Sequence, residues 1–183
     1  MRKKLYIIAG PNGSGKTTMA KELVKDELIT FLNADEIAAK YHDDIGLRSG
    51  RMLLEKFDKL ISLGESVVLE STISGNYHNR IIERARKAKY EIIFVYVFLA
   101  SVEQNLARIK QRVKLGGHNV PDMDVKRRYK RSLRNFWDVY KNVNQWELYY
   151  NGENNYEIVA RGTGEALEIL NDTLYNSFKK EAK

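Results

Sequence analysis

The feature that most restricts how this chain can fold is the octapeptide Gly10-Pro11-Asn12-Gly13-Ser14-Gly15-Lys16-Thr17, which matches the pattern G-x-x-x-x-G-K-S/T at every fixed position. It follows the apolar run Leu5–Ala9 and precedes helix-forming residues, so it should link a buried strand to the start of a helix. Glycines let successive backbone N–H groups turn toward an anion, and the following helix adds the positive end of its dipole. The segment is therefore predicted to bind the phosphates of a nucleotide.

Two side chains at the end of this motif have chemical roles in that interpretation. Lys16 can reach the outer phosphates, and the hydroxyl of Thr17 can hold Mg²⁺. The residues expected to contact the nucleotide are Gly10, Pro11, Asn12, Gly13, Ser14, Gly15, Lys16, Thr17 and Thr18. The alternative is a plain strand-to-helix turn, which does not require three glycines followed by Lys and Thr. The sequence therefore predicts ATP and Mg²⁺ as cofactors.

Length and composition exclude several classes of protein. The chain has 183 residues, 43% hydrophobic and 30% charged, which favours a globular domain with a substantial core. It has no cysteines, which excludes disulfides and thiolate metal sites. No apolar run approaches the roughly 18 residues that span a membrane, and Leu5–Ala9 is shorter than a signal-peptide core. We expect a single domain over residues 1–183, in the cytoplasm and without membrane contact.

Short apolar runs alternate with longer amphipathic stretches, which is typical of βαβ units and a mainly parallel sheet. Strands are predicted at Leu5–Ala9, Thr30–Asn33, Val67–Ser71, Ile92–Leu99, Trp146–Tyr150 and Tyr156–Ala160. Helices are predicted at Lys16–Lys25, Leu47–Leu63, Tyr77–Ala88, Val102–Leu115, Val125–Val143 and Glu165–Lys180. The predicted fold class is α/β, a nucleoside-kinase-like P-loop NTPase with three layers, a mainly parallel sheet and a basic helical lid.

Two acidic residues are predicted at the carboxyl ends of strands, where ligands bind in an open α/β sheet. Asp35 follows the strand Thr30–Asn33, and Glu70 lies near the end of Val67–Ser71. A carboxylate placed there can accept the proton of an attacking hydroxyl or bind the metal. Asp35 could instead cap a helix over Glu36–Tyr41, and Glu70 could form a structural ion pair. We expect Asp35 to be catalytic and Glu70 to bind substrate and metal.

A basic segment in the second half of the chain is expected to act as a lid. The net charge is +7, with 31 Lys and Arg against 24 Asp and Glu, and much of the excess lies between Arg108 and Arg134. Phosphoryl transfer needs arginines where water is excluded, which predicts a lid over about residues 108–136. Arg112 and Arg128, on either side of its glycine loop, are predicted to be catalytic, and the other arginines are assigned to solvent. The alternative is a pair of solvated basic helix faces.

With these pieces in place, the chain resembles the zeta-toxin-like P-loop kinases. The matching segments are Gly10–Thr17, Asn33-Ala34-Asp35, Ser49-Gly50-Arg51, Glu70-Ser71-Thr72-Ile73-Ser74-Gly75 and the block from Gly116–Pro121 to Arg128–Asn135. Together they span about residues 5 to 136. Members of this family are ATP-dependent kinases, and the best-known ones phosphorylate a ring hydroxyl of a UDP-linked amino sugar.

The resemblance implies roles for single residues. Asp35 would be the general base, and Glu70 with Thr72 would contact the substrate. Arg51 would help to hold the acceptor. Lys16 and the arginines of the lid would stabilise the transferred phosphoryl group, and an antitoxin-like protein partner is consistent with the same resemblance.

The predicted lid departs from the toxin pattern at one position. His118 stands where toxin-like members tend to carry an arginine, two residues before a Thr-Pro pair, and here Val120-Pro121 takes the place of that pair. Arg128 is expected to substitute from the next helix. A single histidine in a glycine loop could also be a surface residue.

These observations favour one function and leave two alternatives. The chain lacks the N-K-x-D segment that reads guanine in GTPases, which disfavours that class. The leading hypothesis is a kinase that moves the γ-phosphoryl group of ATP to a hydroxyl of a small metabolite, for which a UDP-amino sugar is one candidate. A nucleic-acid end kinase would also suit the basic charge and would show steep salt dependence. A nucleic-acid binder would more often show basic residues interleaved with exposed aromatics. The third reading is a regulatory ATP-binding module or ATPase without an acceptor.

Overall fold

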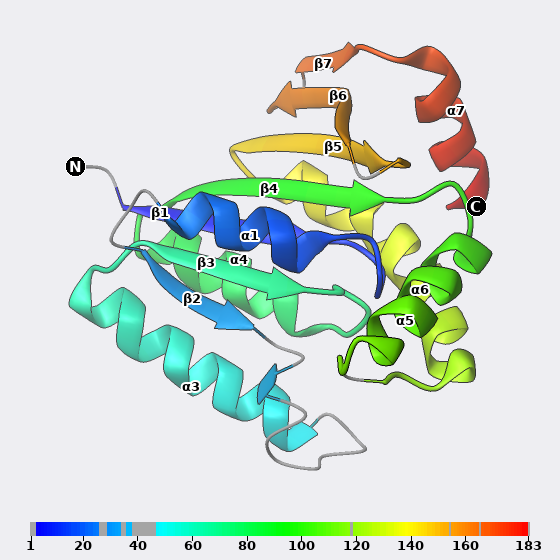
Figure 1. Ribbon diagram of the computed structural model, residues 1–183. Coiled ribbons are helices and arrows are strands. Elements are labelled where there is room, and N and C mark those ends of the chain that lie inside the picture. The colour runs from blue at the N-terminus through cyan, green and yellow to red at the C-terminus, as the bar shows by residue number, and fades with distance from the viewer. Residues whose placement is uncertain are drawn as a thin grey trace.

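The computed structural model describes residues 3–25, 29–33, 36–37, 47–117, 119–153, 155–164 and 166–182. Within this part of the chain, seven strands form one sheet in the order β2-β3-β1-β4-β5-β6-β7, with helices on both faces (Figure 1). The first five strands are parallel, whereas β6 and β7 pair antiparallel at one edge. The predicted α/β fold with a mainly parallel sheet is confirmed.

The bounds of the elements agree with the predicted ones to within four residues at each end, except for the predicted helix Glu165–Lys180. The strands are β1 (Lys4–Ala9), β2 (Thr30–Asn33), β3 (Val67–Ser71), β4 (Glu91–Phe98), β5 (Gln145–Asn151), β6 (Tyr156–Thr163) and β7 (Ala166–Ile169). The helices are α1 (Lys16–Lys25), α3 (Leu47–Leu63), α4 (Tyr77–Lys87), α5 (Val102–Lys114), α6 (Asp122–Val139), the 3-10 helix η1 (Tyr140–Asn142) and α7 (Asp172–Glu181). Among the described residues, no helix combines the length and apolarity needed to cross a bilayer.

The alternating direction of side chains along a strand explains why helices cover both faces of the sheet. Leu5 and Ile7 of β1 belong to the larger core, which α3, α4, α6 and α7 cover, whereas Ile8 belongs to a smaller core under α1. In Figure 1, α1 lies in front of the sheet and α4 behind it. Because β1 is buried on both faces, it is apolar along most of its length.

An aromatic cluster in the larger core fixes the second half of the chain to the sheet. The ring of Phe136 on α6 lies 5.0 Å from that of Phe178 on α7 and 5.2 Å from that of Tyr96 on β4, both in edge-to-face geometry. The hydroxyl of Tyr96 also shares a 2.8 Å hydrogen bond with Ser132 of α6. Each such aromatic pair contributes about 0.5–1.5 kcal/mol beyond its buried area, so α6 is firmly anchored at its C-terminal half.

The strand order places one loop at the centre of the carboxyl edge of the sheet. β1 lies between β3 and β4, and the chain passes from β1 outward to β2 before it returns to β3 and crosses to β4. In such sheets, ligands bind outside the carboxyl ends of the strands at the point where the strand order reverses. The loop that follows Ala9 begins at this point.

The predicted helix over Glu165–Lys180 is wrong between Ala166 and Asn171. Ala166–Ile169 form the strand β7, which pairs with β6 around a turn at Gly164, whose φ is +57°. The helix α7 begins only at Asp172, where the side chain of Asn171 provides the N-cap. All four side chains of β7 are exposed, so the strand carries no alternating pattern of burial that sequence reasoning could detect.

Candidate active site

The loop after β1 has a backbone that requires glycine at three positions. Gly10, Gly13 and Gly15 have φ angles of +141°, +81° and +99°, a region that other residues rarely adopt. Space is also restricted, because a Cβ atom at Gly10 would lie 2.0 Å from the carbonyl oxygen of Val97, and one at Gly13 would lie 2.7 Å from that of Asn105. The loop is thus shaped by its own glycines and by close packing against β4 and α5.

Three side chains from outside the motif donate hydrogen bonds to its carbonyl oxygens. The pairs are Asn105 Nδ2 to Asn12 (2.7 Å), Asn151 Nδ2 to Ser14 (2.9 Å) and Tyr156 OH to Gly15 (2.8 Å). The donors come from α5, β5 and β6, and lie 93 to 141 positions from their acceptors along the chain. None of the three was predicted from the sequence. No local pattern marks them, apart from the Asn-Gly turn signal at residues 151–152.

Lys16 and Thr18 lie in the first turn of α1. Only 5% of Lys16 is exposed, and its ammonium group donates to the carbonyl oxygen of Pro11 at 3.1 Å. This contact holds the positive charge across the loop instead of in solvent. Thr18 is exposed, and its backbone N–H donates to Gly15 at 3.1 Å.

The two residues predicted to bind metal are brought together. The hydroxyl of Thr17 donates to Oε1 of Glu70 at 2.7 Å, and Nδ2 of Asn33 donates to Oε2 of the same carboxylate at 3.1 Å. Glu70 is only 3% exposed, and the strand register places it opposite Asn33. Hydroxyl and carboxylate oxygens are the ligands that Mg²⁺ prefers, so Thr17 and Glu70 fit a Mg²⁺ ion beside nucleotide phosphates.

The loop after β3 has a strained backbone that α6 supports. Ile73 is fully buried and has a φ of +45°, an unusual conformation for a β-branched residue. Its carbonyl oxygen accepts a 2.6 Å hydrogen bond from Nδ2 of Asn135 on α6. In the same loop the hydroxyl of Thr72, predicted to contact substrate, shares a 2.9 Å hydrogen bond with Ser74. Strained segments held by neighbouring elements are frequent at functional sites.

The predicted arginines occupy different surroundings. Arg112 is exposed near the end of α5, Arg128 is half-buried on α6, and Arg51 is exposed on α3. The assignment of Arg108 to solvent is wrong, because its guanidinium donates to the carbonyl oxygen of Asn151 at 2.7 Å and to that of the next residue at 2.5 Å. Arg108 lies one turn after Asn105 on α5, so the same side of this helix that packs on the loop also reaches the end of β5.

Asp35 and His118 lie outside the described residues, so their predicted roles stay predictions. The alternative role predicted for Asp35 is to cap a helix that begins at Glu36. In the structure, Asn33 makes a capping contact with Glu36. The side chain of Asn33 accepts a 3.1 Å hydrogen bond from the backbone N–H of Glu36. Asn33 therefore links the chain after β2 to the carboxylate of Glu70, a role that sequence reasoning did not assign to it.

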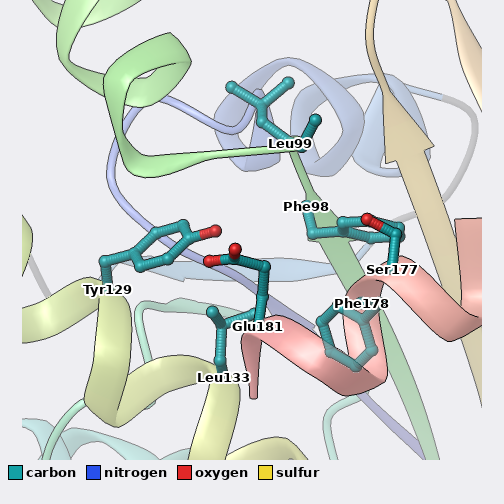
Figure 2. Close-up of a pocket in the computed structure, with 8 residues that line it drawn as sticks. Phe98, Leu99, Tyr129, Leu133, Ser177, Phe178 and Glu181 are labelled. Carbon is teal, nitrogen blue, oxygen red and sulfur yellow. The ribbon is translucent and has the colours of Figure 1, made fainter. Parts of the chain in front are cut away.

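A separate hollow lies between α6, α7 and the end of β4 (Figure 2). Figure 2 shows the hydroxyl of Tyr129 and the carboxylate of Glu181 turned toward each other. Burial, and then the charge of Glu181, raises the pKa of Tyr129. The hollow is too narrow for a water molecule and is lined in part by Phe98, Leu133 and Phe178, so it is a packing feature behind α6.

Comparison with known sequences agrees with this geometry. The chain matches the family described as AAA domain over residues 5–135. A protein of Haemophilus influenzae, itself uncharacterised, is 35% identical over 143 residues, which cover 70% of this chain and 99% of that protein. An adenylate kinase of Campylobacter curvus is 35% identical over 104 residues, which cover 56% of this chain and 50% of that enzyme.

Solved structures share the fold at low sequence identity. The AvrRxo1-ORF1:-ORF2 complex with ATP has a TM-score of 0.73 at 17% identity, covering 100% of this chain and 64% of that chain. A structure of the PezAT chromosomal toxin-antitoxin system of Streptococcus pneumoniae has a TM-score of 0.62 at 15% identity, covering 98% and 86%. This chain thus spans half of the adenylate kinase and under two thirds of the AvrRxo1 chain. The family match covers most of the chain and includes the phosphate-binding loop, so the protein belongs to this AAA-domain family and has a P-loop kinase-like fold.

Proposed function

We propose that this protein is an ATP-dependent kinase that transfers the γ-phosphoryl group of ATP to a hydroxyl group of a small molecule. The observation that carries the proposal is the 2.7 Å hydrogen bond between Thr17 and Glu70 at the carboxyl edge of the sheet. Thr17 directly follows Lys16 in the sequence. Two relatives in sequence, an adenylate kinase and a cytidylate kinase, support phosphoryl transfer over plain ATP hydrolysis.

The proposed chemistry assigns a task to each residue of the site. The loop amides and Lys16 bind the β- and γ-phosphates and stabilise the charge that develops on the transferred group. Thr17 and Glu70 hold Mg²⁺, which when bound neutralises phosphate charge. Asp35 accepts the proton of the acceptor hydroxyl. The oxygen of that hydroxyl forms a bond to the γ-phosphorus while the bond between this phosphorus and the ADP oxygen breaks.

The acceptor and the partner are proposed from the zeta-toxin-like motifs. A UDP-linked amino sugar is the first acceptor to test, with Arg51, Glu70 and Thr72 on the acceptor side. The segment of about residues 108–136 is proposed as the lid, with Arg112 and Arg128 reaching the phosphates on closure. An antitoxin-like protein would be the partner, as in the toxin-antitoxin system whose fold this chain shares. We place the reaction in the cytoplasm, where ATP and Mg²⁺ are available.

The test is transfer of label from γ-labelled ATP by the purified protein. Separate reactions contain UDP-amino sugars, nucleosides and oligonucleotides with a 5′ hydroxyl. We expect label on one small-molecule hydroxyl, lost in Lys16→Ala and Asp35→Asn and kept in Lys21→Ala, which removes an exposed lysine from the same helix. Labelled inorganic phosphate alone would replace the proposal with an ATPase, and labelled oligonucleotide with steep salt dependence would replace it with an end kinase.

A further inference from the structure

Two polar side chains on neighbouring strands bind neighbouring carbonyl groups of the phosphate-binding loop. Asn151 is the last residue of β5, Tyr156 is the first residue of β6, and the two are cross-strand partners. Asn151 Nδ2 donates to the carbonyl of Ser14 at 2.9 Å, and the hydroxyl of Tyr156 donates to that of Gly15 at 2.8 Å. Because the donors are adjacent across the strands, they match acceptors that are adjacent along the chain.

These two hydrogen bonds fix the direction of backbone N–H groups. A trans peptide group is planar, so the N–H that follows a carbonyl points the opposite way, and the described residues contain no cis peptide bond. With the Ser14 carbonyl held by Asn151, the N–H of Gly15 points away from β5. The Gly15 carbonyl accepts from Tyr156 and from the backbone N–H groups of Thr18 and Met19, so the N–H of Lys16 points away from these donors. Both N–H groups lie at the start of α1, the end of a helix that attracts anions.

We propose that Asn151 and Tyr156 are positioning residues that aim the N–H groups of Gly15 and Lys16 at the phosphates of the nucleotide. The inference rests on the proposed function in one respect, namely that this loop binds a nucleotide. It assigns a role in phosphate binding to the adjoining ends of β5 and β6, which lie outside the motif and outside the residues 5–135 that the family match covers.

The packing around Asn151 supports a fixed orientation of its amide group. Only 3% of Asn151 is exposed, and a Cβ atom at Gly15 would lie 2.3 Å from its Nδ2. The third glycine of the motif is therefore needed for this approach as well as for its φ of +99°. Arg108 holds the backbone of Asn151 from the other side, through a 2.7 Å hydrogen bond to its carbonyl oxygen.

The other end of the same amide is consistent with a role beyond packing. Among the described residues, Oδ1 of Asn151 is buried and accepts no hydrogen bond. A buried acceptor without a donor lowers stability, and an apolar side chain would avoid this cost. Asparagine at this position therefore has a stability disadvantage, which its donation to the loop explains.

The experiment compares two variants with two matched controls. Asn151→Ala and Tyr156→Phe remove the donors, whereas Tyr149→Phe removes a hydroxyl from β5 that donates to Glu147 at 2.9 Å. Asn171→Ala removes the N-cap of α7 and so lowers stability away from the loop. Calorimetry gives the Kd for MgATP, thermal unfolding gives Tm, and ¹H–¹⁵N spectra of the nucleotide-free protein report the amides of the loop.

The inference predicts that Asn151→Ala and Tyr156→Phe each raise the Kd for MgATP by about fivefold to tenfold, the effect of one net hydrogen bond. The amide resonances of Gly15 and Lys16 shift in both variants and in neither control. Unchanged amide resonances with wild-type affinity would overturn the inference, and so would a loss of affinity that only follows Tm, as in Asn171→Ala. If Asn151→Ala does not fold, the Kd and the amide resonances of Tyr156→Phe, which removes a single oxygen, test the inference.

Failure of the proposed function would look different. The wild-type protein would then bind no MgATP at all. The inference that the N–H groups of Gly15 and Lys16 are directed at nucleotide phosphates would then also be refuted. The amide resonances of Gly15 and Lys16 in the nucleotide-free variants would still show whether Asn151 and Tyr156 set the direction of these groups.

Discussion

The substitution Glu70→Gln keeps the shape of the side chain and removes its charge. Glu70 is 3% exposed and accepts hydrogen bonds from Thr17 at 2.7 Å and from Asn33 at 3.1 Å. Glutamine keeps one acceptor oxygen and turns an NH₂ group toward the other donor, so about one hydrogen bond is lost, roughly 1 kcal/mol net. A neutral amide is easier to bury than a carboxylate, which offsets this loss. We therefore expect Tm to change by less than about 4 °C.

The expected effect on turnover is much larger than the effect on stability. Two unit charges about 4 Å apart attract each other by about 4 kcal/mol at an effective dielectric constant of about 20. If removal of the Glu70 charge weakens Mg²⁺-dependent stabilisation of the transition state by about 2–4 kcal/mol, kcat falls about 30-fold to 1000-fold. The Mg²⁺ concentration for half-maximal activity should rise as well.

The assay is transfer of γ-label at saturating ATP over a range of Mg²⁺ concentrations, with thermal unfolding in parallel. Glu65→Gln is the matched control, because Oε2 of Glu65 also accepts a 2.7 Å hydrogen bond from a hydroxyl group, that of Thr30. This pair lies at the amino ends of β2 and β3, away from the candidate site. This control should stay within about twofold of the wild type, as expected for a site away from the chemistry. A Glu70→Gln variant that keeps the wild-type Mg²⁺ dependence and most of its turnover would refute the reasoning.

Three further perturbations have expected outcomes. In Gly15→Ala, a Cβ atom 2.3 Å from Asn151 Nδ2 should abolish MgATP binding by calorimetry. Asn135→Ala removes the 2.6 Å hydrogen bond to Ile73 and should lower the free energy of unfolding by about 1–2 kcal/mol in urea titrations. Burial lowers the pKa of His78 below its ordinary 6.5, so stability should be complete above that pH and fall below it, and His78→Gln should flatten the dependence of Tm between pH 8 and pH 5. Wild-type ATP affinity, an unchanged free energy or an identical pH profile would contradict these expectations in turn.

The parallel part of the sheet could be predicted because its strands are buried between two layers of helices. β1 and β4 consist mainly of apolar residues for this reason. β7 could not be predicted, because its four exposed residues, Ala-Leu-Glu-Ile, suit a helix as well as a strand and its pairing depends on the turn at Gly164. A strand that is buried on both faces shows a run of apolar residues in the sequence, whereas an exposed edge strand is specified mainly by the strand with which it pairs.

The helices of the predicted lid could be predicted, but the side on which each packs could not. Basic residues occur on several sides of α5, so charge alone gave no reason to separate Arg108 from Arg112. The docking of α5 on the loop, through Asn105, decides which side is covered. Arg108 and Arg112 both lie on the side of Asn105. Arg108, one turn from Asn105, becomes half-buried, whereas Arg112, about two turns from Asn105, stays exposed.

The phosphate-binding loop shows why a motif can be found in a sequence when the residues that support it cannot. A Cβ atom at Gly10, Gly13 or Gly15 would collide with an atom of Val97, Asn105 or Asn151, respectively, on three different elements. The glycine spacing therefore reflects two requirements at once, the positive φ angles of the loop and the close approach of its surroundings. The motif shows that atoms must come close at these positions, but it contains no information on which residues supply them. Those residues are set by the path of the whole chain, so the differences in nucleotide binding between proteins with the same motif should be sought in the side chains that hold its carbonyl groups.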